Sequence, residues 1–429
     1  MRSHPHRNSV GKVTASHRHP LLICLTLAII IGTGQATAHP SGGPHKKCVP
    51  SARDGCTHPS AIVSMGDSYL SGEAGRWAGN ADTGAGGTAW GTDRAAVRCA
   101  SEDSCDHYPE QIYGSTSYVR GGNRCDRSYR APITATDYPG VPAERRFNIA
   151  CSGATTYEFT HEYADKHERP QIDQLKDLAR EYRVKMVVVS IGGNDLKFKD
   201  IVESCARRYL VGFVDYCKDA WGGMGDELDA VEVKVGQALK DVRKGLEDLG
   251  YEEADYRLVV QSYPAPIPPG SEYRYPEKYV RYTSGGCPFY DTDSDWARDT
   301  VVAGMGSRLR RAASDAGATF LDVRDAFAGH ELCSKDARQA TSANSSKNRL
   351  SSQDAEWARW IPYLYFSGLP WTSQGDQQES IHPNYFGQLA LGTCLTRLSE
   401  QLQVSDRTRF RCLNDGHDGA DGMNVTTTL

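Results

Sequence analysis

Short apolar runs rich in β-branched residues recur along this chain, with helical stretches between them. The apolar runs lie at 61–63, 147–150, 186–190, 256–261 and 319–323. Helix-like patterns lie at 172–182, 226–249, 295–316 and 385–402. Strands that alternate with helices favour a parallel sheet that is covered on both faces. The sequence therefore predicts a three-layer α/β/α sandwich around a central, mostly parallel five-stranded sheet.

The first 38 residues have the pattern of a secretory signal peptide. Basic residues precede an apolar run at 21–31 that is too short to span a bilayer, and Ala36-Thr37-Ala38 supplies small residues for cleavage. An uncleaved membrane anchor is the alternative. No other apolar run is long enough to cross a membrane. We therefore expect a secreted, extracellular protein with no stable membrane insertion after cleavage.

The charge balance bears on possible partners. The formal net charge of the 429-residue chain is −5, and the predicted signal carries cations but no carboxylates, so its removal makes the chain more acidic. An acidic exported protein is poorly suited to bind nucleic acid. We expect no nucleic-acid partner, and we expect a monomer.

Cysteine usage agrees with export. Of the 13 cysteines, Cys24 lies in the predicted signal, and the others form an even set: Cys48, Cys56, Cys99, Cys105, Cys125, Cys151, Cys205, Cys217, Cys287, Cys333, Cys394 and Cys412. An even set in an oxidising compartment predicts mostly paired disulfides, with Cys205 and Cys217 as a local pair. No Cys-x-x-Cys pair occurs, which disfavours structural zinc. Residues 76–145 have little periodicity and hold several cysteines, which favours a loop-rich, disulfide-stapled insertion.

Residues suited to acyl transfer follow three of the predicted strands and precede the last helix. They are Gly66-Asp67-Ser68, Gly153, Gly193-Asn194-Asp195 and His382. The ends of parallel strands share one edge of a sheet, so the first three segments should converge there. A serine hydroxyl needs an adjacent base, normally histidine, and a tetrahedral oxyanion needs fixed hydrogen-bond donors. The backbone N–H groups of Ser68 and Gly153 and the side-chain amide of Asn194 are candidate donors.

In this order, the four segments resemble the SGNH hydrolases, also called the GDSL family. The resemblance runs from about residue 60 to residue 403 and is closer to the secreted, disulfide-bonded actinobacterial esterases and lipases of that family. Supporting segments are Cys125-Asp126-Arg127-Ser128, Tyr263-Pro264-Ala265-Pro266 and the stretch from Ala326 to Cys333. The rival serine signature G-x-S-x-G is absent.

The resemblance implies a fold and a set of roles. The fold would be SGNH-like, a flavodoxin-like arrangement, over residues 61–403. Ser68 would be the nucleophile and His382 the general base, with Ser68, Gly153 and Asn194 as the oxyanion hole. A disulfide between Cys287 and Cys333, and the absence of any cofactor or metal, are further implications. Around this domain we expect a signal peptide at 1–38, a lead-in at 39–60 and a partly disordered tail at 404–429.

One position departs from the family pattern. The family usually has Asp three residues before the histidine, and here that residue is Glu379, which is one methylene longer. Three alternatives stay open: Glu379 orients His382, Asp376 does so, or a backbone carbonyl replaces the acid. Glu379 is the acid at the family's spacing, so it is taken as the candidate third catalytic residue.

These residues predict a secreted, cofactor-free serine esterase or lipase that hydrolyses carboxylic esters of acyl groups or lipids through an acyl-enzyme on Ser68. One alternative is a deacetylase of O-acetylated polysaccharide or of a secondary metabolite. Another is an inactive binding protein on the same scaffold, which would not need the intact serine, histidine and oxyanion-hole set. Aromatic residues between Trp360 and Trp371 precede His382 and belong either to the core or to an acyl-binding wall.

Overall fold

The computed structural model describes residues 58–81, 92–101, 104–119, 121–212, 215–341, 343–344, 348–362, 374–402 and 408–428. All of them belong to one compact unit, 48–429. The predicted signal peptide, nearly all of the predicted lead-in and most of the aromatic stretch before His382 lie outside the described residues. Those three expectations stay predictions.

A seven-stranded sheet forms the centre of the fold, in the order β4-β1-β5-β6-β7-β8-β9. Every neighbouring pair is parallel except β8 and β9, which are antiparallel. The strands of this sheet are β1 (Ser60–Gly66), β4 (Arg146–Asn148), β5 (Arg183–Ser190), β6 (Arg257–Gln261), β7 (Thr319–Asp322), β8 (Arg409–Asn414) and β9 (Met423–Thr427). A separate hairpin pairs β2 (Ala96–Ser101) with β3 (Ser104–His107). The predicted fold class, an α/β fold with a mostly parallel central sheet, is confirmed.

Two features of the C-terminal region correct the sequence-based expectation. The sheet has two strands more than the five expected, and both added strands lie in the stretch expected to be a partly disordered tail. The composition is polar, but alternate residues Phe410, Cys412 and Val425 are buried in the core. Strand pairing with β7 and burial of these few apolar side chains are sufficient to order a segment whose average composition suggests disorder.

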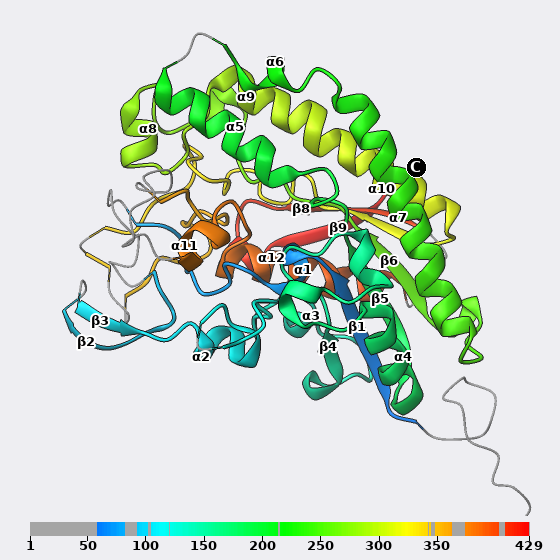
Figure 1. The fold of residues 1–429 in the computed structure, drawn as a ribbon. Helices are drawn as coiled ribbons and strands as arrows, with labels where there is room; N and C mark the ends of the chain where they lie inside the picture. Colours follow the sequence, from blue (N-terminus) through cyan, green and yellow to red (C-terminus); the bar gives the residue numbers. More distant parts are fainter. Residues whose placement is uncertain are drawn as a thin grey trace, which may run out of the picture. The chain divides into compact units, whose positions relative to one another are not determined.

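Helices cover both faces of the sheet. The α-helices are α1 (Ser68–Ser71), α2 (Glu110–Tyr113), α3 (Pro132–Ala135), α4 (Gln171–Glu181), α5 (Phe198–Val211), α6 (Cys217–Ala220), α7 (Met224–Glu247), α8 (Tyr279–Thr283), α9 (Asp291–Trp296), α10 (Ala303–Asp315), α11 (Gln374–Glu379) and α12 (Tyr385–Leu402). In Figure 1 the long helices α7 and α10 run side by side over the sheet.

Strand β5 shows how the two faces of the sheet are buried. Val187 and Val189 belong to a core cluster that they share with α4, α7 and α10. Met186 and Val188 belong to a second cluster that contains residues of α3 and α12. Successive side chains of a strand point to opposite faces, so a run that is apolar on both faces lies between two helical layers. This arrangement makes the three-layer sandwich.

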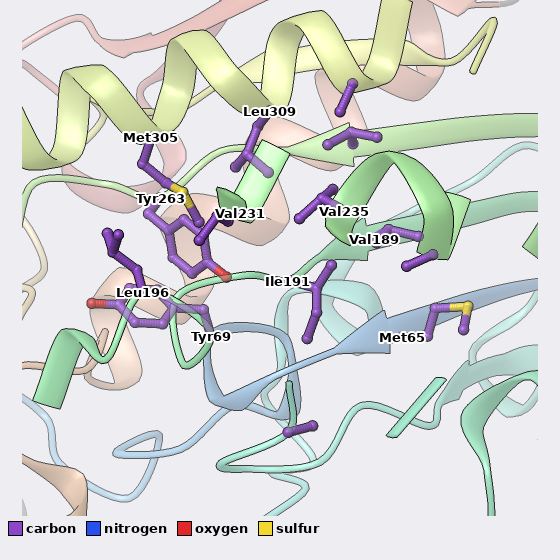
Figure 2. Close-up of a cluster of buried hydrophobic side chains, with 14 of the residues drawn as sticks. Met65, Tyr69, Val189, Ile191, Leu196, Val231, Val235, Tyr263, Met305 and Leu309 are labelled. Carbon is purple, nitrogen blue, oxygen red and sulfur yellow. The ribbon is translucent and has the colours of Figure 1, made fainter. Parts of the chain in front are cut away.

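The first core cluster extends from the middle of the sheet to the ends of its strands. Figure 2 shows Val189 and Ile191 near β1, with Val231, Val235 and Leu309 from the covering helices. Further along, Met305 of α10 lies beside the ring of Tyr263. The same packed layer therefore supports the loops that follow β1, β5 and β6.

A π-helix interrupts one of the covering helices. Residues Ala297–Val302 form this π-helix, η7, which joins α9 directly to α10. Single π-helical turns inside α-helices are rare and occur often at functional sites, because the wider turn displaces the side chains that it carries. Here two of those side chains, Val301 and Val302, line a cavity at the strand ends.

Disulfides tie the loops to the core. The described residues contain the bridges Cys125–Cys151, Cys205–Cys217, Cys287–Cys333 and Cys394–Cys412, and Cys105 is also disulfide-bonded. The local pair expected from spacing and the pair implied by family resemblance are both confirmed. Within the described part of the chain, no helix combines the length and apolar character that a membrane crossing requires.

Candidate active site

Ser68 lies where β1 ends and α1 begins. The strand reaches Gly66, whose φ of +139° is in the region that favours glycine. A Cβ at this position would lie 2.0 Å from the backbone oxygen of Ser190 in β5. The side chain of Gln171 binds both the N–H and the C=O of Gly66, at 2.7 and 2.8 Å. This close approach fixes the point at which the chain turns into α1.

Asp67 caps α1 and connects it to the neighbouring loops. Its carboxylate accepts a hydrogen bond from the backbone N–H of Tyr69 at 3.1 Å and a short one from the hydroxyl of Tyr263. The same Tyr263 hydroxyl accepts the N–H of Gly193 at 3.1 Å. Burial raises the pKa of Asp67 to about 7, although the hydrogen bond from Tyr263 opposes the shift. Tyr263 therefore joins the turn after β1 to the turn after β5.

His382 meets Ser68 across the edge of the sheet. Its Nε2 lies 2.7 Å from the hydroxyl oxygen of Ser68. The histidine precedes α12, whose first turn is capped by Asn384: the N–H groups of Phe386 and Gly387 donate to its side-chain oxygen at 3.0 and 3.2 Å. The two residues are thus held by the starts of two different helices, and their contact suits a nucleophile and its general base.

The other ring nitrogen of His382 contacts the main chain. Nδ1 lies 3.0 Å from the carbonyl oxygen of Ser380, so a proton on Nδ1 leaves Nε2 free to accept from Ser68. Between the two residues, Ile381 has a φ of +67°, a conformation that is costly for a β-branched side chain. Hydrogen bonds hold this turn, because the N–H of Ile381 donates to Arg359 at 2.8 Å and its carbonyl accepts from Tyr69 at 3.3 Å.

Glu379 is not the neighbour of the imidazole that its spacing suggested. Its buried carboxylate accepts hydrogen bonds from Trp77 Nε1 at 2.7 Å and from the Tyr113 hydroxyl at 2.5 Å. Arg76 lies 3.9 Å away. The carboxylate therefore ties α11 to the loop after α1 and to α2, while a carbonyl takes the position at Nδ1. The side chain of Asp376 lies outside the described residues.

Gly153 lies in the turn after β4. Its φ is +78°, and a Cβ would lie 2.8 Å from the hydroxyl of Tyr163. The preceding carbonyl, that of Ser152, accepts a hydrogen bond from Lys166 Nζ at 2.6 Å. The disulfide of Cys151 anchors the turn on its other side. Glycine and these contacts fix the path of this turn, which lines the same cavity as Ser68.

Asn194 and Asp195 bind the same turn from the loop after β5. The side-chain amide of Asn194 donates to the carbonyl of Ala154 at 2.9 Å. Asp195 accepts from the backbone N–H of Thr156 at 2.9 Å and from its hydroxyl at 2.8 Å. The predicted third segment thus fixes the second, and Asn194 retains one amide hydrogen for another acceptor.

The sequence-predicted residues share one cavity. It has a volume of about 610 Å³, and its lining includes Ser68, Gly153, Asn194 and His382. In the hydrogen bonds of the described residues, the backbone N–H groups of Ser68 and Gly153 have no protein acceptor. The rest of the lining has an apolar part, formed by Leu196, Phe198, Val202, Val301, Val302, Met305, Ile361 and Ile381, and it also contains polar or charged residues such as Lys199, Glu203 and Arg207. The site therefore combines a serine–histidine contact and two unpaired backbone donors with a partly apolar cavity.

Several supporting residues were missed by sequence reasoning. Tyr263 was noted within a family-like segment but given no role, and Gln171, Lys166 and Glu73 were not singled out. Each acts through contacts between residues distant in the sequence, such as the 105-residue separation between Gly66 and Gln171. No local pattern identifies such pairs.

One cluster of side chains that could in principle bind a metal ion has a structural use. In the acidic run Asp291–Asp295, Asp293 accepts the N–H groups of Cys217 and Lys218, both at 3.1 Å. Asp293 also lies near the sulfurs of Cys205 and Cys217, but these form a disulfide. Oxidised cysteines offer no thiolate ligand, so this cluster does not fit a metal ion.

The fold and the site define an acylhydrolase-type α/β protein. Residues 111–389 match the GDSL-like Lipase/Acylhydrolase family, and the chain belongs to that family. The Gly66-Asp67-Ser68 segment lies ahead of the matched range, and His382 lies within it.

Two proteins from Streptomyces are similar to this chain in sequence. Lipase 2 of Streptomyces coelicolor is 25% identical over 263 residues, which cover 59% of this chain and 72% of the relative. An esterase of Streptomyces scabiei is 26% identical over 216 residues, which cover 45% of this chain and 59% of that protein.

Two solved structures were also matched. An extracellular lipase from Streptomyces rimosus gives a TM-score of 0.39 at 20% identity, covering 77% of this chain and 94% of that one. A phospholipase A1 from Streptomyces albidoflavus NA297 gives 0.40 at 18% identity, covering 77% and 95%.

The contacts of Glu379 predict that Glu379→Gln affects stability more than turnover. The side-chain NH₂ of the new glutamine would face the N–H of Trp77 or the hydroxyl of Tyr113, and two donors that face each other leave a hydrogen bond unmade. The free energy of unfolding should therefore fall by about 1–3 kcal/mol. Turnover of the folded enzyme should stay within about threefold of wild type, whereas loss of a true triad acid costs about 10⁴-fold. Denaturant unfolding and steady-state kinetics on one preparation measure both. A loss of turnover above 10³-fold without loss of stability would restore Glu379 as the acid partner.

Proposed function

We propose that this protein is a secreted serine esterase or lipase that hydrolyses carboxylic esters. The observation that carries the proposal is the 2.7 Å contact between Ser68 and His382 at the wall of an apolar cavity. Membership of the acylhydrolase family and the multiple disulfides support it. A serine nucleophile with a histidine base can hydrolyse an ester without a metal or a cofactor.

In the first half-reaction, Ser68 Oγ attacks the ester carbonyl carbon while its proton moves to His382 Nε2. The oxyanion receives hydrogen bonds from the N–H groups of Ser68 and Gly153 and from the amide of Asn194. Collapse breaks the bond to the alcohol, which leaves with the proton from Nε2. In the second half, water gives a proton to Nε2 and attacks the acyl-enzyme, and Ser68 regains its proton as the acid departs.

The carbonyl of Ser380 takes the place of the triad acid at Nδ1. A carbonyl oxygen fixes the tautomer by accepting the Nδ1 proton, and it carries a partial negative charge toward the imidazolium. The turn around Ile381 keeps this oxygen in place, because the N–H of Ile381 donates to the carbonyl of Arg359 and the Tyr69 hydroxyl donates to the carbonyl of Ile381.

The cavity favours an acyl group longer than acetyl. Its apolar wall is formed by α5, η7 and α10, and a second cavity of about 30 Å³ lies behind Phe198, Val202 and Val302, which line both. Burial of each methylene contributes about 0.8 kcal/mol, so an apolar groove of this kind rewards a fatty acyl chain. Hydrolysis of acetyl esters alone would favour the deacetylase alternative.

One prediction of the proposed function concerns the two reacting residues. Ser68→Ala and His382→Ala should each lower kcat by at least about 10³-fold. The double variant should be little worse than either single variant, because the two side chains act as one unit. Steady-state hydrolysis of p-nitrophenyl esters measures these effects, and circular dichroism checks the fold. Activity of either variant within tenfold of wild type would reject the proposal.

A second prediction concerns chain length. Val302→Phe fills the cavity where the π-helix faces it, so kcat/KM for palmitate should fall at least about tenfold relative to acetate, the equivalent of two buried methylenes. The matched control is Val233→Phe on α7, where the valine is 74% exposed and does not line the cavity. A p-nitrophenyl ester series from acetate to palmitate gives the comparison. An unchanged chain-length profile in Val302→Phe would show that the acyl group binds elsewhere.

A further inference from the structure

A buried carboxylate lies near Nε2 of His382, whereas the Ser380 carbonyl lies at Nδ1 on the other side of the ring. It belongs to Glu73, whose residue is 1% exposed. Gly72 ends α1 with a φ of +91°, and a Cβ there would lie 2.8 Å from Cβ of Ser128. After this tight left-handed turn, the next residue, Glu73, lies in the interior at the cavity of Ser68 and His382 and not at the solvent surface.

The contacts of Glu73 fix one oxygen and leave the other without a partner. Oε2 accepts the hydroxyl of Ser152 at 2.5 Å and lies 3.7 Å from Nε2 of His382. Oε1 is buried and has no hydrogen-bond partner among the described residues. Glu73 also lines the cavity that contains Ser68. A buried carboxylate that has one unused oxygen and places its other oxygen near a reacting nitrogen calls for a functional explanation.

Titratable groups from several elements face Glu73. They are Asp67 and Tyr69 at α1, Asp126 in the loop before α3, Tyr163 and Lys166 in the loop before α4, and His382 before α12. Burial, with the charges of Glu73 and Glu379 next, raises the pKa of Asp126 to about 8. Burial lowers the pKa of Lys166, and the charge of Glu73 is the largest influence that opposes this. Lys166 is the amine of the group, and its Nζ donates to the Ser152 carbonyl.

We propose that Glu73 is a positioning residue that stabilises the imidazolium form of His382 from its Nε2 edge. This inference rests on the proposed function, because an imidazolium forms there only if Ser68 and then water give up a proton to Nε2. When Ser68 Oγ becomes bonded to the acyl carbon, it accepts a hydrogen bond less well. The protonated Nε2 then has Glu73 Oε2 as its nearest carboxylate oxygen, until it passes the proton on.

The proposal gives a separate role to each group near the imidazole ring of His382. The Ser380 carbonyl selects the tautomer at Nδ1, but a carbonyl has no net charge. Glu379, at the spacing usual for the family's acid, binds Trp77 and Tyr113. Glu73 supplies a carboxylate close to the ring, and Ser152 orients it through the turn that also carries Gly153. The oxyanion donor and the imidazole are thus linked by one short chain of contacts.

The test is Glu73→Gln, which is nearly isosteric and still accepts the Ser152 hydroxyl. Removal of the charge should lower kcat by about 10- to 100-fold with little change in KM, because the interaction is made only after proton transfer. The acid limb of the profile of kcat/KM against pH should move to lower pH, since the imidazolium form loses a stabilising charge. The matched control, Glu379→Gln, also removes a buried carboxylate and should leave this limb where it is. Burial and then the charge of Glu73 raise the pKa of Asp126, so Asp126→Asn is measured as a further variant. It shows how much Asp126 itself contributes to the basic limb of the profile of kcat/KM against pH.

The outcomes are distinguishable from failure of the proposed function. If Ser68→Ala is inactive while Glu73→Gln keeps the wild-type kcat and pH profile, the inference about Glu73 is overturned and the esterase proposal stands. If Ser68→Ala keeps its activity, the proposed function itself fails. Should Glu73→Gln not fold, Ser152→Ala provides the second test, because it removes the hydroxyl that orients the carboxylate. A kcat in Ser152→Ala that equals wild type would overturn the inference, and a reduced kcat at unchanged KM would support it.

Discussion

The close approach of β1 and β5 at Gly66 determines where the reacting groups lie. At this point only hydrogen fits in place of a side chain, because the backbone oxygen of Ser190 lies 2.0 Å from where a Cβ would be. The N–H of Asp67 donates to that same oxygen at 3.1 Å, and Gln171 binds both polar backbone groups of Gly66. Ser68 is therefore presented by buried main chain, and the loops that complete the site are built against this fixed point.

Electrostatics imposes the second constraint, because the site is surrounded by buried carboxyl groups. Asp67, Glu73, Asp126 and Glu379 all lie within the protein near the strand ends. A buried carboxyl group is unfavourable unless it is hydrogen-bonded, and each of these four accepts from a different donor or pair of donors. Tyr263 donates to Asp67, Ser152 to Glu73 and Gln378 to Asp126, while Trp77 and Tyr113 donate to Glu379. A raised pKa, as for Asp67 and Asp126, keeps a buried acid protonated, and so uncharged, up to a higher pH than usual.

The sequence predicted the fold class because its five parallel strands are short, apolar and separated by amphipathic helices. It also predicted the residues at the strand ends, since the topology of a parallel sheet brings them to one edge. It did not predict β8 and β9, because β8 depends on pairing with β7, and β9 on pairing with β8, rather than on their own composition. The role of Glu379 was open because a spacing of three residues does not say where a side chain points. A left-handed Ile381 turns the Ser380 carbonyl to the ring, and no local pattern signals that turn.

The central claim is that Ser68 is the nucleophile of an ester hydrolase. A p-nitrophenyl alkylphosphonate tests it most directly, because the serine adduct resembles the tetrahedral intermediate and is not released by water. We expect one equivalent of p-nitrophenol per protein, loss of esterase activity in proportion, and a mass increase confined to the peptide that contains Ser68. Inactivation with the adduct on another residue, or full activity after stoichiometric labelling of Ser68, would contradict the account.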